Sequence, residues 1–342
     1  MTLVCCWLDK SYGQNKITAL ADARAADLGA DGKWTPRTEL TTKLYKVPMA
    51  CYSISSLNPA VGGWDSPYYT TEIGIGFAGY CFEAMSIIAL FKRFVGTLVA
   101  YPDSDSNVEP EIDDQAPTPE PKKLVDILMA VIDGWFSSSR SDQHVEFLLF
   151  GFSPQNGHPW CAQVERIKGG TARLVLVENT LQEYSVFSIG DAGHGDKFKQ
   201  EVEDILGRIR KQSDGINAGG DINERLDNDL EKARLHLASR KTVEQAVINE
   251  INNEFRETVG GVLQKMEIYA VEVNRAVAGF TRDSKDFNID MLPAAADRLG
   301  YIPILQNMGR VMPVMDVRSL AEARVPGDAN EDFGSMPEGG LT

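Results

Sequence analysis

The segment MTLVCCWL (residues 1–8) begins a strand-forming run almost at the first residue. A second such run, KITALADARAA (residues 16–26), follows DKSYGQN, whose Gly and Asn are typical of a turn. The two runs predict a β-hairpin whose first strand starts at Thr2. A strand in this position takes the beginning of the chain into the interior of the protein. This placement is consistent with a chemical role for the N-terminal residues.

Further along the chain, the apolar pattern predicts separate blocks of strands and helices. Strands or strand pairs are expected at 42–54, 71–79, 145–166, 170–190 and 260–274, and helices at 80–98, 122–136, 196–212, 222–239 and 242–255. This order lacks the strict β-α alternation of a doubly wound fold. Helices on both outer faces of two stacked antiparallel sheets would satisfy it. We therefore expect an α+β protein built as a four-layer αββα sandwich.

Three segments stand outside this pattern. Residues 102–121 contain five prolines and seven acids, a composition that predicts a flexible surface insertion. Residues at about 212–240 are expected to form a helical insertion. Residues 280–342, rich in Pro, Gly and Asp towards the end, predict a C-terminal extension and tail after a main domain at 1–279.

Composition and charge exclude several functions. A net charge of −15 argues against binding to a nucleic-acid backbone. The absence of a long apolar run and of a positively charged leader predicts no membrane span and no signal peptide. Five cysteines without C-x-x-C spacing indicate reduced thiols in a cytoplasmic protein.

Neither a metal nor a cofactor is expected. The four histidines share no ligand spacing and have no cysteine partners. The glycine-rich segment GDAGHG (residues 190–195) lacks the Lys-Ser/Thr that completes a phosphate-binding loop.

Thr2 carries a hydroxyl group and, once Met1 is removed, a free α-amine. A small residue at position 2 is the usual context for removal of the initiator methionine. An α-amine has an ordinary pKa of about 7.7–8.0, so a modest perturbation makes it a base near neutrality. A threonine hydroxyl needs such a base before it can attack a carbonyl carbon. Processing alone also explains a small second residue, so Thr2 does not decide the function by itself.

Two charged residues in otherwise apolar strands point to the same chemistry. Asp22 lies within ALADARAA, with Arg24 two residues later, and Lys43 lies within TTKLYKV. A buried carboxylate needs a charged or hydrogen-bonding partner. A lysine beside the α-amine would lower the pKa of that amine, and a carboxylate would hold the lysine in place. The alternative is an ordinary ion pair of Asp22 with Lys43 or with Arg24.

The N-terminal threonine, the ALADARAA segment and the TTKLYKV segment follow one another along the chain. This order resembles that of the active-site motifs in the proteasome β-subunit family and its bacterial relatives, which are N-terminal-nucleophile hydrolases. Thr2 falls on the nucleophile of the family, and Asp22 falls on the aspartate of its A-D-x-R motif. Lys43 falls on the active-site lysine. Gly79, in GFAGYCFEA, falls on the glycine whose N–H helps to form the oxyanion hole. The resemblance covers about residues 2–275.

The residues around this set depart from the family. Where the family has a serine in a GSG loop, SIGDAGHG has Asp191. In FRETVGG, Arg256 or Glu257 stands at the position of the family's aspartate, and Val259 stands at that of its serine. Arg24, Asp191 and Glu257 are the candidates for residues that support this set.

The resemblance implies a threonine peptidase or amidohydrolase that cleaves a peptide, or another amide, without a cofactor. It also implies a homo-oligomer, for which a closed ring and an open arrangement are both compatible with the sequence. An unfoldase partner fits the family, although no sequence feature points to one. The alternative is a catalytically inactive protein of the same fold that serves as an assembly or binding subunit. That alternative holds if Met1 is retained, because the α-nitrogen of Thr2 is then an amide.

Overall fold

The computed structural model describes residues 2–10, 15–29, 33–53, 57–58, 63–64, 67–100, 118–190, 194–216, 222–253, 259–271 and 275–283. Most of the predicted acidic insertion, through residue 117, and residues 284–342 of the predicted extension lie outside these ranges. The helices are α1 (Cys81–Val95), α2 (Pro121–Ser138), α3 (His194–Asp214) and α4 (Ile222–Ile251). The strands are β1 (Leu3–Asp9), β2 (Lys16–Ala21), β3 (Ala25–Leu28), β4 (Trp34–Thr38), β5 (Leu44–Ser53), β6 (Leu57–Asn58), β7 (Gly63–Trp64), β8 (Tyr69–Gly79), β9 (Leu98–Ala100), β10 (Val145–Phe152), β11 (Pro159–Arg166), β12 (Arg173–Glu178), β13 (Val186–Gly190), β14 (Leu263–Val271) and β15 (Arg275–Asp283).

The beginning of the chain belongs to a five-stranded antiparallel sheet of order β13-β1-β2-β14-β15. The predicted hairpin of β1 and β2 is confirmed, with Val4 opposite Ala21. On its other side β1 pairs with β13, which places Leu3 opposite Gly190. Every residue of β1 is buried, because side chains on both faces of this strand are covered by other layers. Thr2 therefore enters the interior at the start of β1.

The second sheet has six strands in the order β12-β11-β10-β8-β5-β9. Its pairings are antiparallel except for β5 with β9. Strand β8 alternates isoleucine and phenylalanine with glycine, and Gly76 lies where a Cβ atom would be 2.6 Å from Val4 of the other sheet. Glycine at this position lets the two sheets approach closely.

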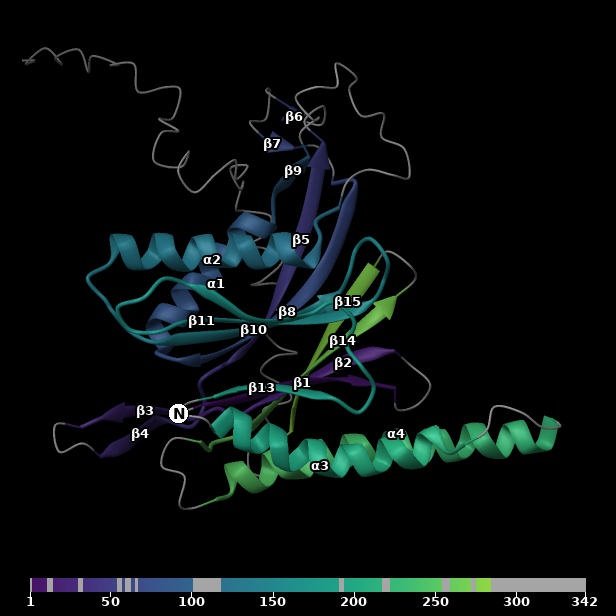
Figure 1. Cartoon of the computed structure of the whole chain (residues 1–342). Coiled ribbons are helices and arrows are strands. Elements are labelled where there is room, and N and C mark those ends of the chain that lie inside the picture. The colour runs from purple at the N-terminus through teal and green to yellow at the C-terminus, as the bar shows by residue number, and fades with distance from the viewer. Residues whose placement is uncertain are drawn as a thin grey trace, which may run out of the picture.

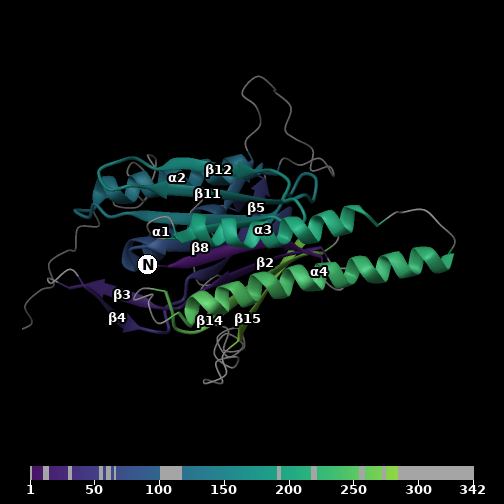
Figure 2. The same ribbon diagram turned by 60° about the horizontal axis from the view of Figure 1, so that its bottom comes forward.

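Apolar side chains form three core layers. Successive residues of a strand point to opposite faces of its sheet, so they enter different layers. The first lies between the six-stranded sheet and α1 and α2, and it includes Phe77 and Phe91. The second lies between the two sheets and includes Val4 and Phe150. The third lies between the five-stranded sheet and α3 and α4, and it includes Trp7. Figure 1 shows the same order, with α1 and α2 on one outer side and α3 and α4 on the other, and Figure 2 shows α3 and α4 side by side. The expected α+β composition is confirmed.

The second predicted strand is shorter than expected. The run 16–26 was expected to be continuous, but β2 ends at Ala21 and the chain resumes as β3 in a small sheet with β4. The break occurs at Asp22, whose carboxylate accepts the backbone N–H of Arg24 at 3.2 Å. Such a bond from a side chain to the backbone two residues later competes with the strand ladder. This break turns the Asp22 carboxylate towards the start of β1.

Two other boundaries differ from the prediction. The two helices expected at 222–239 and 242–255 form the single helix α4. Residues 240–242 contain neither Gly nor Pro, and Arg240 bonds Glu244 along the helix at 2.9 Å. The strand expected at 260–274 is present as β14, and a further strand that was not expected, β15, follows it and pairs with it in antiparallel fashion.

The range predicted as a helical insertion, 212–240, covers the end of α3 and the first part of α4. Within the described ranges, no helix is long and apolar enough to cross a membrane.

Candidate active site

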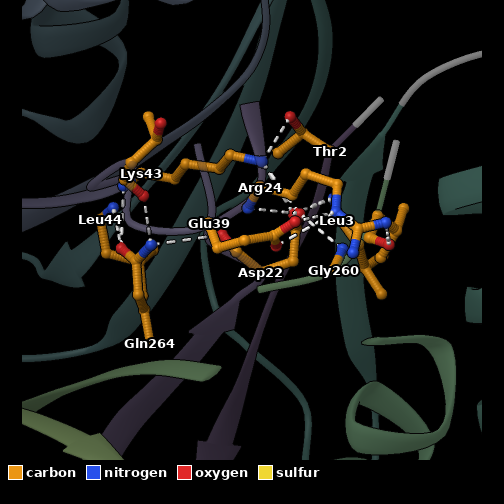
Figure 3. A network of polar contacts seen from close by, with 11 residues as sticks. Thr2, Leu3, Asp22, Arg24, Glu39, Lys43, Leu44, Gly260 and Gln264 are labelled. Atoms are coloured by element: carbon orange, nitrogen blue, oxygen red, sulfur yellow. Dashed lines mark hydrogen bonds and ion pairs between the residues drawn. The ribbon is translucent and has the colours of Figure 1, made fainter. Parts of the chain in front are cut away.

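Three of the residues singled out from the sequence meet at the start of β1. The Nζ atom of Lys43 lies 2.9 Å from Oγ1 of Thr2 and 3.0 Å from each carboxylate oxygen of Asp22 (Figure 3). Thr2 is 3% exposed, and Asp22 and Lys43 are fully buried. The lysine ammonium thus bridges the hydroxyl and the carboxylate in a buried site, where the charge of each group acts strongly on the others.

The Asp22 carboxylate is saturated with donors. Its Oδ1 atom accepts the backbone N–H of Leu3 at 2.9 Å, and its Oδ2 atom accepts those of Arg24 and Gly260 at 3.2 Å each. Together with Lys43, these donors offset the cost of burying a carboxylate. Because the donors come from three separate segments, Asp22 ties the start of β1 to the turn that precedes β14.

Gln264 holds the backbone on which Lys43 sits, and sequence reasoning missed it. Its Oε1 atom accepts the backbone N–H of Lys43 at 2.8 Å, and its Nε2 atom donates to the carbonyl oxygen of Thr41 at 2.6 Å. Nε2 also donates to the carbonyl oxygen of Asp22 at 3.3 Å. Gln264 is fully buried. It reaches the site through the pairing of β14 with β2, a long-range contact that no local motif signals.

Arg24 supports the site from outside it. Its guanidinium does not replace Lys43 as the partner of Asp22: Nε donates to Glu39 at 2.9 Å, and Nη1 donates to the carbonyl oxygen of Val259 at 3.3 Å. The guanidinium lies over Gly260, where a Cβ atom would be 2.4 Å from its Cζ. Arg24 therefore fixes the glycine turn whose N–H reaches Asp22. The contribution of Glu39, which is partly exposed, was not anticipated from the sequence.

Gly79 ends β8, and a single residue, Tyr80, separates it from α1. Its φ angle is +98°, and a Cβ atom there would be 2.4 Å from the carbonyl oxygen of His144, so only glycine fits without strain. Burial raises the pKa of the Cys81 thiol at this junction, and the positive charge of Lys43 opposes that shift. The contacts that surround Gly79 itself are with His144 and Val145.

Asp191 and Glu257 lie outside the described residues. Their described neighbours flank the site: a Cβ atom on Gly190 would be 2.6 Å from the carbonyl oxygen of Thr2, and Gly260 donates to Asp22. The backbone N–H of Gly190 also donates to Glu146 at 3.2 Å. Glu146, His144 and Glu165 form a group of metal-ligand type on the neighbouring strands.

No family model matches the sequence, and no curated protein matches it. Among solved structures, the chain is similar to the Gly-1 mutant of Anbu from Hyphomicrobium sp. strain MC1, with 13% identity and a TM-score of 0.40 over 88% of this chain and 96% of the Anbu chain. It is similar to the same degree to Anbu, described as an ancestral β-subunit, from Yersinia bercovieri. That match has 13% identity and a TM-score of 0.40 over 89% of this chain and 96% of the other.

Proposed function

We propose that this chain is a proteasome-like N-terminal threonine hydrolase that cleaves peptide or other amide bonds through Thr2 after removal of Met1. One observation carries the proposal. Lys43 Nζ lies 2.9 Å from the Thr2 hydroxyl oxygen and 3.0 Å from both oxygens of Asp22, with all three residues buried. A lysine placed against a hydroxyl at the start of a buried strand suits activation of that hydroxyl better than it suits structural stabilisation alone, since burying three polar groups together is costly.

The reaction follows from these groups. The free α-amine of Thr2 accepts the proton of the Thr2 hydroxyl, directly or through a water molecule, and Oγ1 attacks the carbonyl carbon of the substrate. The C–N bond then breaks, and the departing amine takes the proton from the α-ammonium. Water hydrolyses the acyl ester on Thr2, which releases the carboxylic acid and restores the hydroxyl.

Each neighbouring residue has a role in this scheme. The positive charge of Lys43 lowers the pKa of the α-amine, which favours the neutral, basic form. Asp22 balances and orients Lys43. The N–H of Gly79 would donate to the oxyanion that forms on the substrate carbonyl. Gln264 and Arg24 act as positioning residues, and Asp191 and Glu257 stay as supporting candidates.

The architecture is part of the same proposal. We infer that the helix–sheet–sheet–helix order is the αββα sandwich of the N-terminal-nucleophile hydrolases, with residues 1–279 as its domain. The family resemblance in the sequence supports self-assembly, as a closed ring or an open arrangement, in the cytoplasm. The same resemblance favours peptides as substrates and is compatible with an unfoldase partner.

Hydrolysis of a panel of fluorogenic peptide amides tests the proposal. Thr2→Ala should abolish turnover, whereas Thr2→Ser, which keeps a hydroxyl and an α-amine, should retain part of it. Thr35→Ala, at an exposed position on β4, is the matched control and should equal the unaltered protein. No turnover by the unaltered chain after loss of Met1 would instead favour the inactive assembly or binding subunit, and equal non-zero turnover by Thr2→Ala would exclude Thr2 as the nucleophile.

A further inference from the structure

A second cluster of ionisable side chains lies beside Gly190, on β10 and β11 and at the residue just before β10. Glu146 and Glu165 stand directly opposite each other in the antiparallel pair, and His144 precedes Glu146 by two residues. Glu146 shares the face of β10 that carries Leu148 and Phe150 into the space between the sheets. The side chains of Glu146 and Glu165 are only 10% and 14% exposed, and that of His144 is 30% exposed.

We propose that His144, Glu146 and Glu165 bind a divalent first-row transition metal. One ligand atom from each residue lies within 4.8 Å of the others, and His144 Nε2 is 3.2 Å from Glu146 Oε1. Metal–ligand bonds of about 2.0–2.2 Å place neighbouring ligand atoms about 3.0–3.5 Å apart. The distance between His144 Nε2 and Glu146 Oε1 already lies in this range. One imidazole nitrogen with two carboxylates suits Mn²⁺ or Zn²⁺ better than Mg²⁺ or Ca²⁺, which prefer oxygen ligands alone.

The charges at the cluster favour a cation. Carboxylates directly opposite each other on paired strands repel, and this pair is mostly removed from water. Glu165 is balanced by Arg173, whose Nε donates to it at 2.6 Å, but the Arg173 side chain is 63% exposed. An exposed arginine can turn into solvent at little cost and release Glu165 to a metal ion.

The remaining contacts orient the ligands in the way metal sites require. Glu146 Oε2 accepts the backbone N–H of Gly190 at 3.2 Å, which leaves Oε1 directed at His144. Such outer contacts fix the direction of a ligand. Gly190 lies opposite Leu3, so a bound ion would fasten the six-stranded sheet to β13 next to Thr2. The site lies beside the proposed nucleophile but takes no part in the hydrolysis scheme.

Spacing along the sequence hides this group. His144 and Glu146 alone form an unremarkable His-x-Glu, and Glu165 joins them only through the β10–β11 hairpin. Neither helical spacing among histidines nor cysteine partners reveals a group made of a residue just before β10, one on β10 and one on β11.

Titration of the untagged, metal-stripped full chain with Mn²⁺ or Zn²⁺ tests the proposal, read by calorimetry, thermal unfolding and Mn²⁺ paramagnetic resonance. We expect saturable binding of one ion per chain and a higher Tm. Glu165→Gln should weaken binding by about tenfold or more, whereas His158→Ala, at an exposed position in the β10–β11 turn, should not change it.

A further variant separates ligation from folding. Arg173→Ala removes the competitor for Glu165 and should bind the metal more tightly than the unaltered chain. The absence of saturable binding in the unaltered chain would overturn the proposal. Equal affinity in the Glu165→Gln and unaltered proteins, or weaker binding by Arg173→Ala, would do the same. None of these readouts depends on Thr2, so the metal site and the proposed hydrolase can fail separately.

Discussion

The side-chain oxygen of Gln264 accepts the backbone N–H of Lys43 at 2.8 Å, and its amide nitrogen donates to the carbonyl of Thr41, two residues earlier. One buried amide thus fixes the chain on both sides of Thr42 and sets the direction in which the lysine leaves the backbone. The lysine reaches Thr2 because a glutamine from a distant strand holds its backbone.

Gln264→Leu should therefore misplace Lys43. The substitution leaves buried backbone groups without partners and should lower the free energy of unfolding by about 1–3 kcal/mol. Turnover of a peptide amide should fall through kcat more than through KM, because Gln264 acts on Lys43 and not on the substrate. Gln245→Leu, on the exposed face of α4, is the control and should stay within about 0.5 kcal/mol of the unaltered protein. Unchanged kcat in a folded Gln264→Leu protein would contradict the positioning role.

Lys43→Met removes the ammonium while keeping much of the side-chain volume. Asp22 then remains buried without its cation, and the free energy of unfolding should drop by about 3–5 kcal/mol. Replacing both residues, Lys43→Met with Asp22→Asn, removes both charges and should be less damaging than the sum of the single changes. Urea denaturation of the four proteins measures this coupling. Strict additivity would show that the two charges do not depend on each other.

Gly79→Ala tests the junction between β8 and α1. The φ angle of +98° and the carbonyl oxygen of His144, 2.4 Å from the added Cβ, oppose any side chain there. We expect a loss of about 1–3 kcal/mol in unfolding free energy together with a lower kcat. Gly207→Ala is the matched control, because a Cβ atom in this turn of α3 meets nothing within 4 Å. It should be neutral or stabilise by about 0.4–1 kcal/mol. A Gly79→Ala protein as stable as Gly207→Ala would be inconsistent with the observed backbone.

The buried ion pairs around Glu267, under α4, should make the stability of the fold sensitive to acid. Burial raises the pKa of Glu267, but the hydrogen bonds from Tyr269 and Lys16 outweigh burial. With the nearby charge of Lys265 they lower the pKa from 4.5 to about 2. The folded pKa is thus below the unfolded one, so this stabilisation is complete above about pH 4.5 and is lost as the pH falls towards 2.

Urea denaturation between pH 6 and pH 2 measures the effect. The free energy of unfolding should fall by on the order of 2 kcal/mol from this group alone. In Glu267→Gln, which cannot ionise, the fall over the same range should be smaller by that amount. Identical pH profiles for the two proteins would remove Glu267 as a source of acid sensitivity.

Local pattern predicted a large part of the fold. The β1–β2 hairpin, β5, β8, α1, α2 and the β10–β11 hairpin follow from apolar periodicity and turn residues. Periodicity did not reveal that β2 stops at Ala21, since the cause is a bond from the Asp22 side chain to the backbone. Nor did it reveal the continuity of α4, which depends on a junction without helix-breaking residues.

The polar cluster around Thr2 could be predicted in part, because a charged residue in an apolar strand is conspicuous. Asp22 and Lys43 stand out in the sequence for this reason, and the structure places Lys43 against Thr2 and Asp22 against Lys43. Gln264 and Glu39 are ordinary polar residues in sequence, and they matter only through the long-range approach of β14 and β4 to this end of the sheet. The pairing of β1 with β13, which puts Gly190 beside Thr2, is equally non-local.

Intact-mass spectrometry after treatment with a peptide epoxyketone tests the central claim most directly. This reagent forms its ring adduct only where a hydroxyl and a free α-amine belong to the same N-terminal residue. The account predicts a chain that lacks Met1 and carries one adduct on Thr2, with no adduct on Thr2→Ala. A folded chain that keeps Met1 and stays unlabelled, or equal labelling of Thr2→Ala, would contradict it.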